Sequence, residues 1–387
     1  MSQREQAVLM VSASTAVIDL VFELCEQCRS THLRFCVAHS TEEVDLLLEH
    51  RSISMAILDR STIGNLSYLN RLAEHISPMP AVVLTEAGTA EELVAALRNG
   101  ADDVFSLDEL QQHPELFVGA MNRQLQRVEM IDEAVFLRES LERSLDELRA
   151  DQHAAQQLQQ NLLPPPKREL NQICFQYVLQ PSLLLSGDFV DSMAINDHQT
   201  VFYLADVSGH GASSALVTVL LKNMTYRLMR NYNRSSSFDI QSPLATMHRI
   251  NREMLLTGLG KHLTMFIGLV DTQNSTLTYA VGGHHPMPIL QQQGQTLFLE
   301  GRGMPIGLFE EPVFEERCIP LAPQYAITLF SDGILEVAEG GSLEEKEQTL
   351  LRVCSRNNLS PQSIADCIIP AGCINPDDVA IMTVSRV

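Results

Sequence analysis

Short apolar runs alternate with stretches of helical spacing along the first part of the chain. Runs of strand length occur at Ala7–Val11, Leu33–Val37, Met55–Leu58, Ala81–Leu84 and Val104–Phe105. The stretches between them place apolar residues three and four positions apart, and the last helix is predicted at residues 114–126. Strands that alternate with helices predict an α/β domain with a parallel, doubly wound sheet over residues 1–122. The site of such a sheet lies at the carboxyl ends of its strands, where Asp59 and Thr85 fall.

A different pattern covers residues 123–163. No Gly or Pro interrupts Arg123 to Gln160, and Glu, Arg, Gln, Leu and Ala dominate, which predicts one long helix. Part of a heptad repeat is formed by Leu141, Leu145, Leu148, Ala155 and Leu162. Either the helix lies on a domain, or it forms a coiled coil that joins two copies into a homodimer. We favour the coiled coil, because so long a polar helix needs a partner to be stable. Pro164–Pro166 are expected to end the helix.

The remaining residues, 164–387, combine predicted strands with predicted pairs of helices. Helical spacing occurs at 212–232, 243–256, 343–356 and 361–368. Strand-like runs include Val201–Ala205, Leu263–Val270, Thr276–Val281, Ala326–Phe330 and Val379–Val384. Runs of strands followed by helices predict the α+β class, here a β-sandwich flanked by helices. The chain is therefore expected to hold two domains joined by a helical linker.

Composition narrows the range of functions. The basic and acidic residues give 27 − 48 = −21, and no basic patch offsets this charge, which argues against nucleic-acid binding. No apolar run reaches the roughly 18 residues that span a membrane, and no signal peptide opens the chain, so we expect a cytoplasmic protein without a membrane partner. The eight cysteines are then expected to be reduced thiols. Cys25 and Cys28 have redox or zinc spacing, but their helical context favours core packing.

Acidic residues recur at the ends of predicted strands in the C-terminal part. Asp188 precedes one strand, and Asp377 and Asp378 precede the last. Asp206 and Asp332 follow two other strands and lead into turns that contain glycine. A single Asp–Gly turn is usually only structural. Four acidic strand ends in one domain are harder to explain in that way, and they suit a hard cation such as magnesium or manganese.

The order of motifs in this region resembles a known family. Gly-Asp-Phe-x-Asp, Asp-Val-Ser-Gly-His-Gly, Gly-Gly-His-His-Pro, Ser-Asp-Gly and Asp-Asp follow one another between about Leu162 and Val387. This order is similar to that of the metal-dependent (PPM) protein phosphatases of the type 2C class, in their bacterial SpoIIE/RsbU branch. The resemblance implies the PPM β-sandwich and the hydrolysis of phosphomonoesters by water that two Mn or Mg ions activate.

The resemblance also implies the metal ligands. Asp206 would bridge the two metal ions, and the backbone carbonyl of Val207 would add a ligand. Asp332 and Asp377 would complete the shell, and Asp378 is the neighbour that could replace Asp377.

Two further residues have implied roles beside Asp206. Asp188 would bind a metal ion or its water, and His210 would hydrogen-bond a metal-bound water or the phosphate. The residues implied in catalysis are therefore Asp206, Asp188 and His210. The pair His284 and His285 could simply shape the end of a strand.

The N-terminal part resembles the receiver domain of response regulators. Asp59 matches the phospho-acceptor, and Thr85 matches the switch hydroxyl. Receivers hold magnesium with an acidic pair after the first strand, and here Ser12 and Ala13 take those positions. They also carry a lysine after the last strand, where this chain has Ser106–Asp108. Without these stabilising charges we expect Asp59 to be phosphorylated poorly or not at all, and the domain to be a degenerate binding or dimerisation module.

As a whole the chain is similar to the RssB-type regulators of the general stress sigma factor. The first hypothesis is a Mn/Mg-dependent protein serine/threonine phosphatase whose phosphoprotein substrate is an anti-sigma-factor antagonist in partner switching. The alternative is a non-catalytic adaptor that binds a sigma factor or an antagonist protein. An adaptor has no reason to keep the acidic set, so we favour the enzyme.

Overall fold

The structure of the chain is a computed structural model. It describes residues 6–28, 33–50, 53–66, 68–69, 79–209, 211–356, 360–370, 372 and 375–386, without the side chains of 49 and 50. The chain divides into two compact units, residues 1–145 and 146–387, and each is described by itself. All of the predicted helical linker (123–163) except its last residue lies within the helix α7 (Pro114–Leu162), and the boundary between the units falls inside this helix.

The first unit contains the predicted parallel sheet, with strand order β2-β1-β3-β4-β5. Its strands are β1 (Gln6–Val11), β2 (Leu33–Ala38), β3 (Met55–Asp59), β4 (Ala81–Thr85) and β5 (Asp103–Ser106). Its helices before α7 are α1 (Thr15–Cys25), α2 (Thr41–His50), α3 (Arg60–Ile63), α5 (Ala90–Arg98) and α6 (Leu107–Gln112). This strand order is the flavodoxin-like one, which has its site at the carboxyl ends of the central strands.

Both faces of this sheet are covered, because alternate residues of each strand point to opposite sides. Val8 and Met10 of β1 pack in one apolar cluster with α1, α6 and the first turns of α7. Leu9 and Val11 pack in a second cluster with α2, α3 and α5. A sheet buried on both sides explains why the strands have near-continuous apolar sequences. Cys25 and Cys28 are buried in the first cluster, where core packing was expected.

The helix α7 is longer than either sequence segment suggested. The helix predicted at residues 114–126 and the one predicted at 123–160 form one continuous helix of 49 residues. No proline occurs between its first residue and Leu162, so nothing in the sequence forces a break. Its residues 132–150 are exposed, and the exposed side chains include Leu141, Leu145 and Leu148.

The second unit is a sandwich of two antiparallel sheets, as predicted. One sheet has the order β14-β11-β10-β9-β8 and the other the order β13-β12-β15-β16-β7-β6. The first contains β8 (Asp188–Ala194), β9 (Gln199–Val207), β10 (Leu263–Asp271), β11 (Thr276–Gly282) and β14 (Glu316–Pro320). The second contains β6 (Lys167–Leu170), β7 (Ile173–Gln180), β12 (Ile289–Gln292), β13 (Gln295–Phe298), β15 (Tyr325–Phe330) and β16 (Val379–Arg386). The sequence did not indicate β6 and β14, which are edge strands with alternating exposure.

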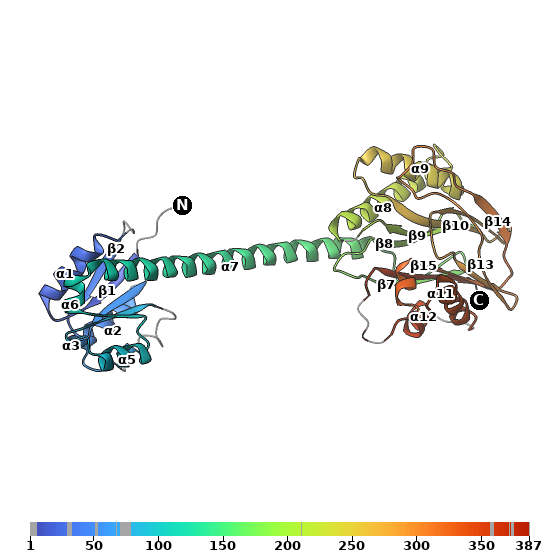
Figure 1. The fold of residues 1–387 in the computed structure, drawn as a ribbon. Coiled ribbons are helices and arrows are strands. Elements are labelled where there is room, and N and C mark those ends of the chain that lie inside the picture. The colour runs from blue at the N-terminus through green and yellow to red at the C-terminus, as the bar shows by residue number, and fades with distance from the viewer. Residues whose placement is uncertain are drawn as a thin grey trace. The chain divides into compact units, whose positions relative to one another are not determined.

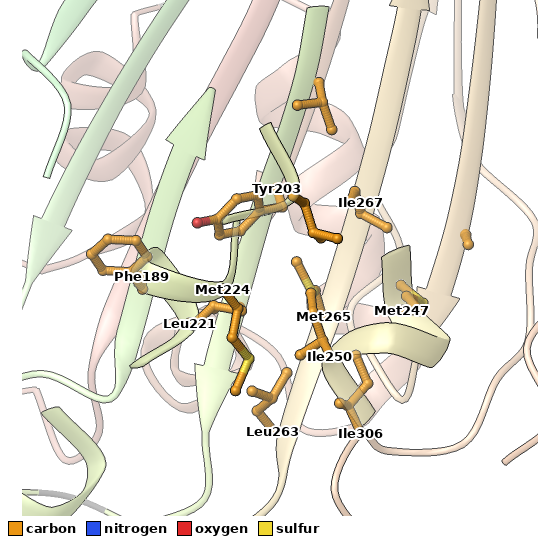
Figure 2. Close-up of a cluster of buried hydrophobic side chains, with 14 of the residues drawn as sticks. Phe189, Tyr203, Leu221, Met224, Met247, Ile250, Leu263, Met265, Ile267 and Ile306 are labelled. Carbon is orange, nitrogen blue, oxygen red and sulfur yellow. The ribbon is translucent and has the colours of Figure 1, made fainter. Parts of the chain in front are cut away.

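Helices cover the outer faces of both sheets (Figure 1). The helices α8 (Ala212–Asn233) and α9 (Pro243–Thr257) pack on the sheet of β8–β11, and Figure 2 shows side chains of this layer, such as Tyr203, Met224 and Ile250. On the other sheet lie α10 (Gly333–Val337), α11 (Leu343–Cys354) and α12 (Pro361–Ile368). A short 3₁₀ helix at Asp239–Gln241 precedes α9. None of the described helices combines the length and apolarity needed to cross a lipid bilayer.

Candidate metal centre

A hairpin places two of the predicted site residues opposite each other. Asp188 begins β8 and is paired with Asp206, near the end of β9. The Val207 N–H donates to the carbonyl of Gly187 (3.2 Å), so the two aspartates form a pair that exchanges no backbone hydrogen bonds. In such pairs the Cα atoms are about 4.5 Å apart and the side chains point to the same face. The register of the hairpin therefore brings both carboxylates together.

The carbonyl of Val207 lies beside them without its usual donor. In a regular ladder the Gly187 N–H would donate to this carbonyl. Instead it donates to Oδ2 of Asp378 (2.6 Å). A Cβ atom on residue 187 would come within 2.8 Å of the Val207 oxygen. Because residue 187 is glycine, the space in front of this oxygen stays open.

The second sheet contributes Asp332 and the pair Asp377 and Asp378 at the same end of the sandwich. β15 and β16 are antiparallel neighbours, and Asp332 follows the end of β15 while the pair precedes the start of β16. A Cβ atom on Gly333 would lie 2.2 Å from the Asp378 carbonyl oxygen, so only glycine permits this approach. The close contact holds Asp332 next to Asp377.

The two adjacent aspartates differ in their hydrogen bonds. Oδ1 of Asp378 accepts from the N–H and the hydroxyl of Ser182 (2.7 and 2.9 Å), and Oδ2 accepts from Gly187. Asp377 accepts with Oδ1 from the N–H of Asp378 (2.8 Å) and is partly exposed. Both oxygens of Asp378 thus hold the backbone that leads to Asp188, whereas Oδ2 of Asp377 accepts no hydrogen bond among the described residues.

Asp188 is the most unusual member of the group. It is 1% exposed, and neither carboxylate oxygen has a hydrogen-bond partner among the residues that the structure describes. The hydroxyl of the nearby Ser331 donates to the Asp378 carbonyl (3.3 Å). Burial raises the pKa of Asp188 well above its usual range, and the carboxylates of Asp206, Asp378 and Asp332 raise it further, against the opposing effect of the Ser331 hydroxyl.

The pKa values of two other carboxyl groups at the site are also raised. Burial, followed by the charges of Asp332, Asp377 and Asp378, raises the pKa of Asp206 to about 7. The pKa of Asp332 is raised by partial loss of water and then by Asp377. A buried carboxylate normally has a cation or several donors beside it, because its charge is costly in an apolar environment. Several carboxylates that raise the pKa values of their neighbours indicate a place for added positive charge.

The oxygen atoms at this site suit a pair of divalent ions such as magnesium or manganese. Those ions prefer carboxylate and carbonyl oxygens. The orphaned oxygens of Asp188 and the open space at the Val207 carbonyl are features that such ions would use. Within the described ranges, no three His, Cys, Asp or Glu side chains already lie close enough together to hold a metal ion. The group is therefore an open arrangement of neighbouring oxygens.

The predicted histidines have different positions. His210 lies outside the described residues. His284 follows β11, which ends on the same side of its sheet as β9, and it is buried beside Phe266. Burial, and then the neighbouring His285, lowers the pKa of His284 to about 3, so its imidazole is neutral. His285 points toward Glu347 of α11 (3.7 Å). These contacts agree with a structural role at the end of a strand.

Two glycines of the site have roles that the sequence motifs did not reveal. Gly187 and Gly333 each directly adjoin a site aspartate, and each allows a backbone approach that any side chain would block. Their position next to aspartate in the motifs was the available signal.

The carboxylate of Asp59 in the first unit is enclosed by donors. Asp59 is buried, its Oδ1 accepts from the N–H and the hydroxyl of Ser61 (3.0 and 2.7 Å), and its Oδ2 accepts from Ser12 and Thr62 hydroxyls (2.7 and 3.4 Å). Ser12 stands where the acidic pair of a receiver would be expected. Thr85 ends the neighbouring strand and donates to the Phe105 carbonyl (3.5 Å). Asp59 therefore acts as the N-cap of α3.

The C-terminal region is similar to known proteins. Residues 196–387 match the family model of stage II sporulation protein E, SpoIIE. The phosphoserine phosphatase RsbP of Bacillus subtilis is 26% identical over 187 residues, which cover 47% of this chain and 44% of RsbP. The phosphoserine phosphatase RsbU of the same organism is 24% identical over 229 residues, which cover 58% of this chain and 66% of RsbU. The chain spans about two fifths to two thirds of the length of these relatives.

The fold of the second unit is also found in a solved structure. The PP2C domain of SiaA from Pseudomonas aeruginosa has a TM-score of 0.50 and 20% identity, over 62% of this chain and 97% of that domain. This likeness confirms the predicted PPM-type sandwich.

Proposed function

We propose that the C-terminal region, a phosphatase domain of the SpoIIE type, hydrolyses phosphoserine or phosphothreonine esters on a protein with the help of two Mn or Mg ions. The observation that supports this most directly is Asp188, a buried carboxylate without a hydrogen-bond partner among the described residues, placed opposite Asp206. A buried carboxylate without hydrogen bonds is stabilised when a cation binds beside it. The motif order and the match to the SpoIIE model support the same activity.

Residues from both sheets would hold the two ions. Asp206 and the Val207 carbonyl would hold the ions from the first sheet, and Asp332 and Asp377 would hold them from the second. Asp188 would bind an ion or orient its water. We favour Asp377 over Asp378 as the ligand, because both oxygens of Asp378 already accept hydrogen bonds from Ser182 and Gly187. His210, four positions after Asp206 in the sequence, would contact the water or the phosphate.

The bound ions would supply an activated water molecule and neutralise charge on the phosphoryl oxygens. The protein would contribute acidic ligands from both sheets and a backbone carbonyl to hold these ions. No nucleophilic side chain is required in this scheme, since water attacks the phosphorus directly. The released products would be the free hydroxyl side chain and inorganic phosphate.

The substrate class is proposed from the relatives. Both matched Bacillus subtilis proteins are phosphoserine phosphatases. By the family resemblance, the substrate of this chain would be a phosphorylated anti-sigma-factor antagonist in a partner-switching pathway. The exposed leucines of α7 would join two chains as a coiled coil, and the receiver-like unit would act as a binding or dimerisation module.

The activity is tested with the full chain and p-nitrophenyl phosphate. We expect manganese-dependent phosphate release that a chelator abolishes and that Asp206→Asn removes. Asp197→Asn, in the exposed turn between β8 and β9, is the matched control and should keep full activity. Activity that survives both the chelator and Asp206→Asn would contradict the proposed metal-dependent reaction.

The alternative function is a non-catalytic adaptor for a sigma factor or an antagonist protein. A pull-down with Asp332→Asn as bait separates the two possibilities. An enzyme should retain its phosphorylated substrate and lose it after the substrate is dephosphorylated, whereas an adaptor should bind its partner regardless of phosphorylation and of manganese.

A further inference from the structure

One residue near the end of α7 contrasts with the exposed stretch of helix before it. In the stretch 129–163, all of which the structure describes, the single buried residue is Gln159, which is 6% exposed. Its neighbour Gln160 is exposed. Leu162 and Leu163 pack against the sandwich core with partly buried side chains. Burying an amide instead of an apolar side chain is unfavourable unless the amide is fully hydrogen-bonded.

The amide of Gln159 is fully engaged. Its Nε2 donates to the carbonyl of Ser186 (2.6 Å) and to the hydroxyl of Thr218 (3.1 Å). Its Oε1 accepts from the N–H of Ser186 (3.2 Å). The side chain therefore pairs with both backbone groups of Ser186, as the backbone of a neighbouring strand would.

Ser186 leads directly into the acidic site. Its hydroxyl accepts from the N–H of Asp188 (3.1 Å), and the next residue, Gly187, is held by Asp378 and by Val207. The backbone before Asp188 is thus fixed by three separate parts of the chain, of which α7 is one. The Asp188 carboxylate has no hydrogen bond of regular geometry among the described residues, so the course of this backbone is a main determinant of where the carboxylate lies.

The third hydrogen bond of Gln159 connects the same side chain to α8. Thr218 is buried, and its hydroxyl donates to the Ala215 carbonyl (2.7 Å) while it accepts from Gln159. α8 begins at Ala212, directly after the turn that follows Asp206. Gln159 therefore bridges the segment before Asp188 and the helix after Asp206.

We propose that Gln159 is a positioning residue, whose amide holds Ser186 and Thr218 so that Asp188 and Asp206 face a divalent ion together. The inference rests on the proposed function, because it assigns Gln159 to the same site. Residues that orient metal ligands without touching the metal typically change metal affinity by about 10- to 100-fold when they are replaced. A glutamine that only stabilises the end of α7 would leave that affinity unchanged.

The test measures manganese binding to the full chain by titration calorimetry. Gln159→Met keeps the length of the side chain and removes all three hydrogen bonds, so we expect about tenfold weaker binding or more. Gln160→Met, an exposed neighbour on the same helix, is the matched control and should bind as the unmodified chain does. Thr218→Val removes one of the three bonds and should produce a smaller loss.

Activity provides a second readout. We expect Gln159→Met to need about tenfold more manganese for half-maximal phosphatase rate, with the rate recovering at saturating manganese. If Gln159→Met does not fold, as judged by circular dichroism, Gln159→Glu is used, because it keeps the volume but cannot donate to Ser186 or Thr218.

The outcomes are distinct. Wild-type affinity in folded Gln159→Met or Gln159→Glu, or an equal loss in Gln160→Met, overturns the role of Gln159. A chain that binds manganese but hydrolyses no phosphomonoester contradicts the proposed function, and the binding series still decides the role of Gln159. A chain that binds no manganese overturns both.

Discussion

Replacing Asp206 by asparagine should stabilise the metal-free protein, although the same change should abolish its activity. Asp206 lies in a buried group of carboxylates, and its pKa is raised from 3.8 to about 7 by burial and by its acidic neighbours. A carboxyl group whose pKa is higher in the folded state favours folding while it is protonated. That contribution is complete below about pH 4 and is lost as the pH rises to about 7.

The size of the effect follows from the shift. A change of about three units corresponds to about 4 kcal/mol, at 1.36 kcal/mol per unit. Because the neighbouring carboxylates can share the proton and relax, we expect Asp206→Asn to raise the free energy of unfolding by about 1–3 kcal/mol at pH 8. At pH 4 the difference should be small, since the carboxyl group is then protonated in the folded state and is close to its ordinary pKa of 3.8 in the unfolded state.

Urea unfolding in the presence of a chelator, at pH 4 and pH 8, measures this difference. Asp271→Asn is the control: partial burial acts to raise the pKa of Asp271, but hydrogen bonds from Asn274, Gln199 and Gln273 lower it overall. Its replacement should therefore destabilise the protein at pH 8. Manganese at about 100 times its Kd should stabilise the unmodified chain by about 2.7 kcal/mol and leave Asp206→Asn unchanged. Equal destabilisation by Asp206→Asn at both pH values, with no difference in the response to manganese, would refute the reasoning.

Three further predictions concern other parts of the chain. Lys222→Met should lower the free energy of unfolding by about 3–5 kcal/mol, because it leaves Asp191 without its buried partner at 2.6 Å, and adding Asp191→Asn should restore most of the loss in a urea titration. Asp59 should form no stable acyl phosphate when the chain is incubated with acetyl phosphate and analysed by mass spectrometry. Asp59→Ala should lower the free energy of unfolding by about 1–2 kcal/mol, because the helix cap is lost. A phosphorylated Asp59 would contradict the expectation that the surrounding hydroxyl groups keep this carboxylate from reacting. Leu145→Asp should convert a dimer into a monomer in analytical ultracentrifugation, because it places a charge among the exposed leucines of α7. An unchanged mass would argue against the coiled coil.

The sequence predicted the elements that carry a strong local period. The parallel sheet of the first unit and the sandwich of the second follow from apolar runs and from alternation that each strand carries by itself. α7 was divided in two because residues 114–126 were assigned to a domain and residues 123–160 to a linker, although no residue between them breaks a helix. Edge strands such as β6 and β14 were missed because exposure makes their sequences polar.

The aspartates of the candidate site could be identified because each lies beside a strand end or a glycine. The hydrogen bonds that surround them could not be predicted from the sequence. The hydrogen bond from Gly187 to Asp378 joins residues 191 positions apart, and the one from Gln159 to Ser186 joins residues 27 apart. Such pairs leave no periodic signal, because each depends on how separate elements pack and not on either segment alone.

The pairing of Asp188 with Asp206 limits how this region can change in length. One residue inserted inside β8 or β9 would shift the pairing, and a shift by one residue turns a side chain to the opposite face of a sheet. Extra residues at the distal turn, where Asp197 and His198 are exposed, would leave the pairing intact. Natural length variation among proteins with this hairpin should therefore collect at that turn, which is also the place where a reporter peptide could be grafted without disturbing the acidic end.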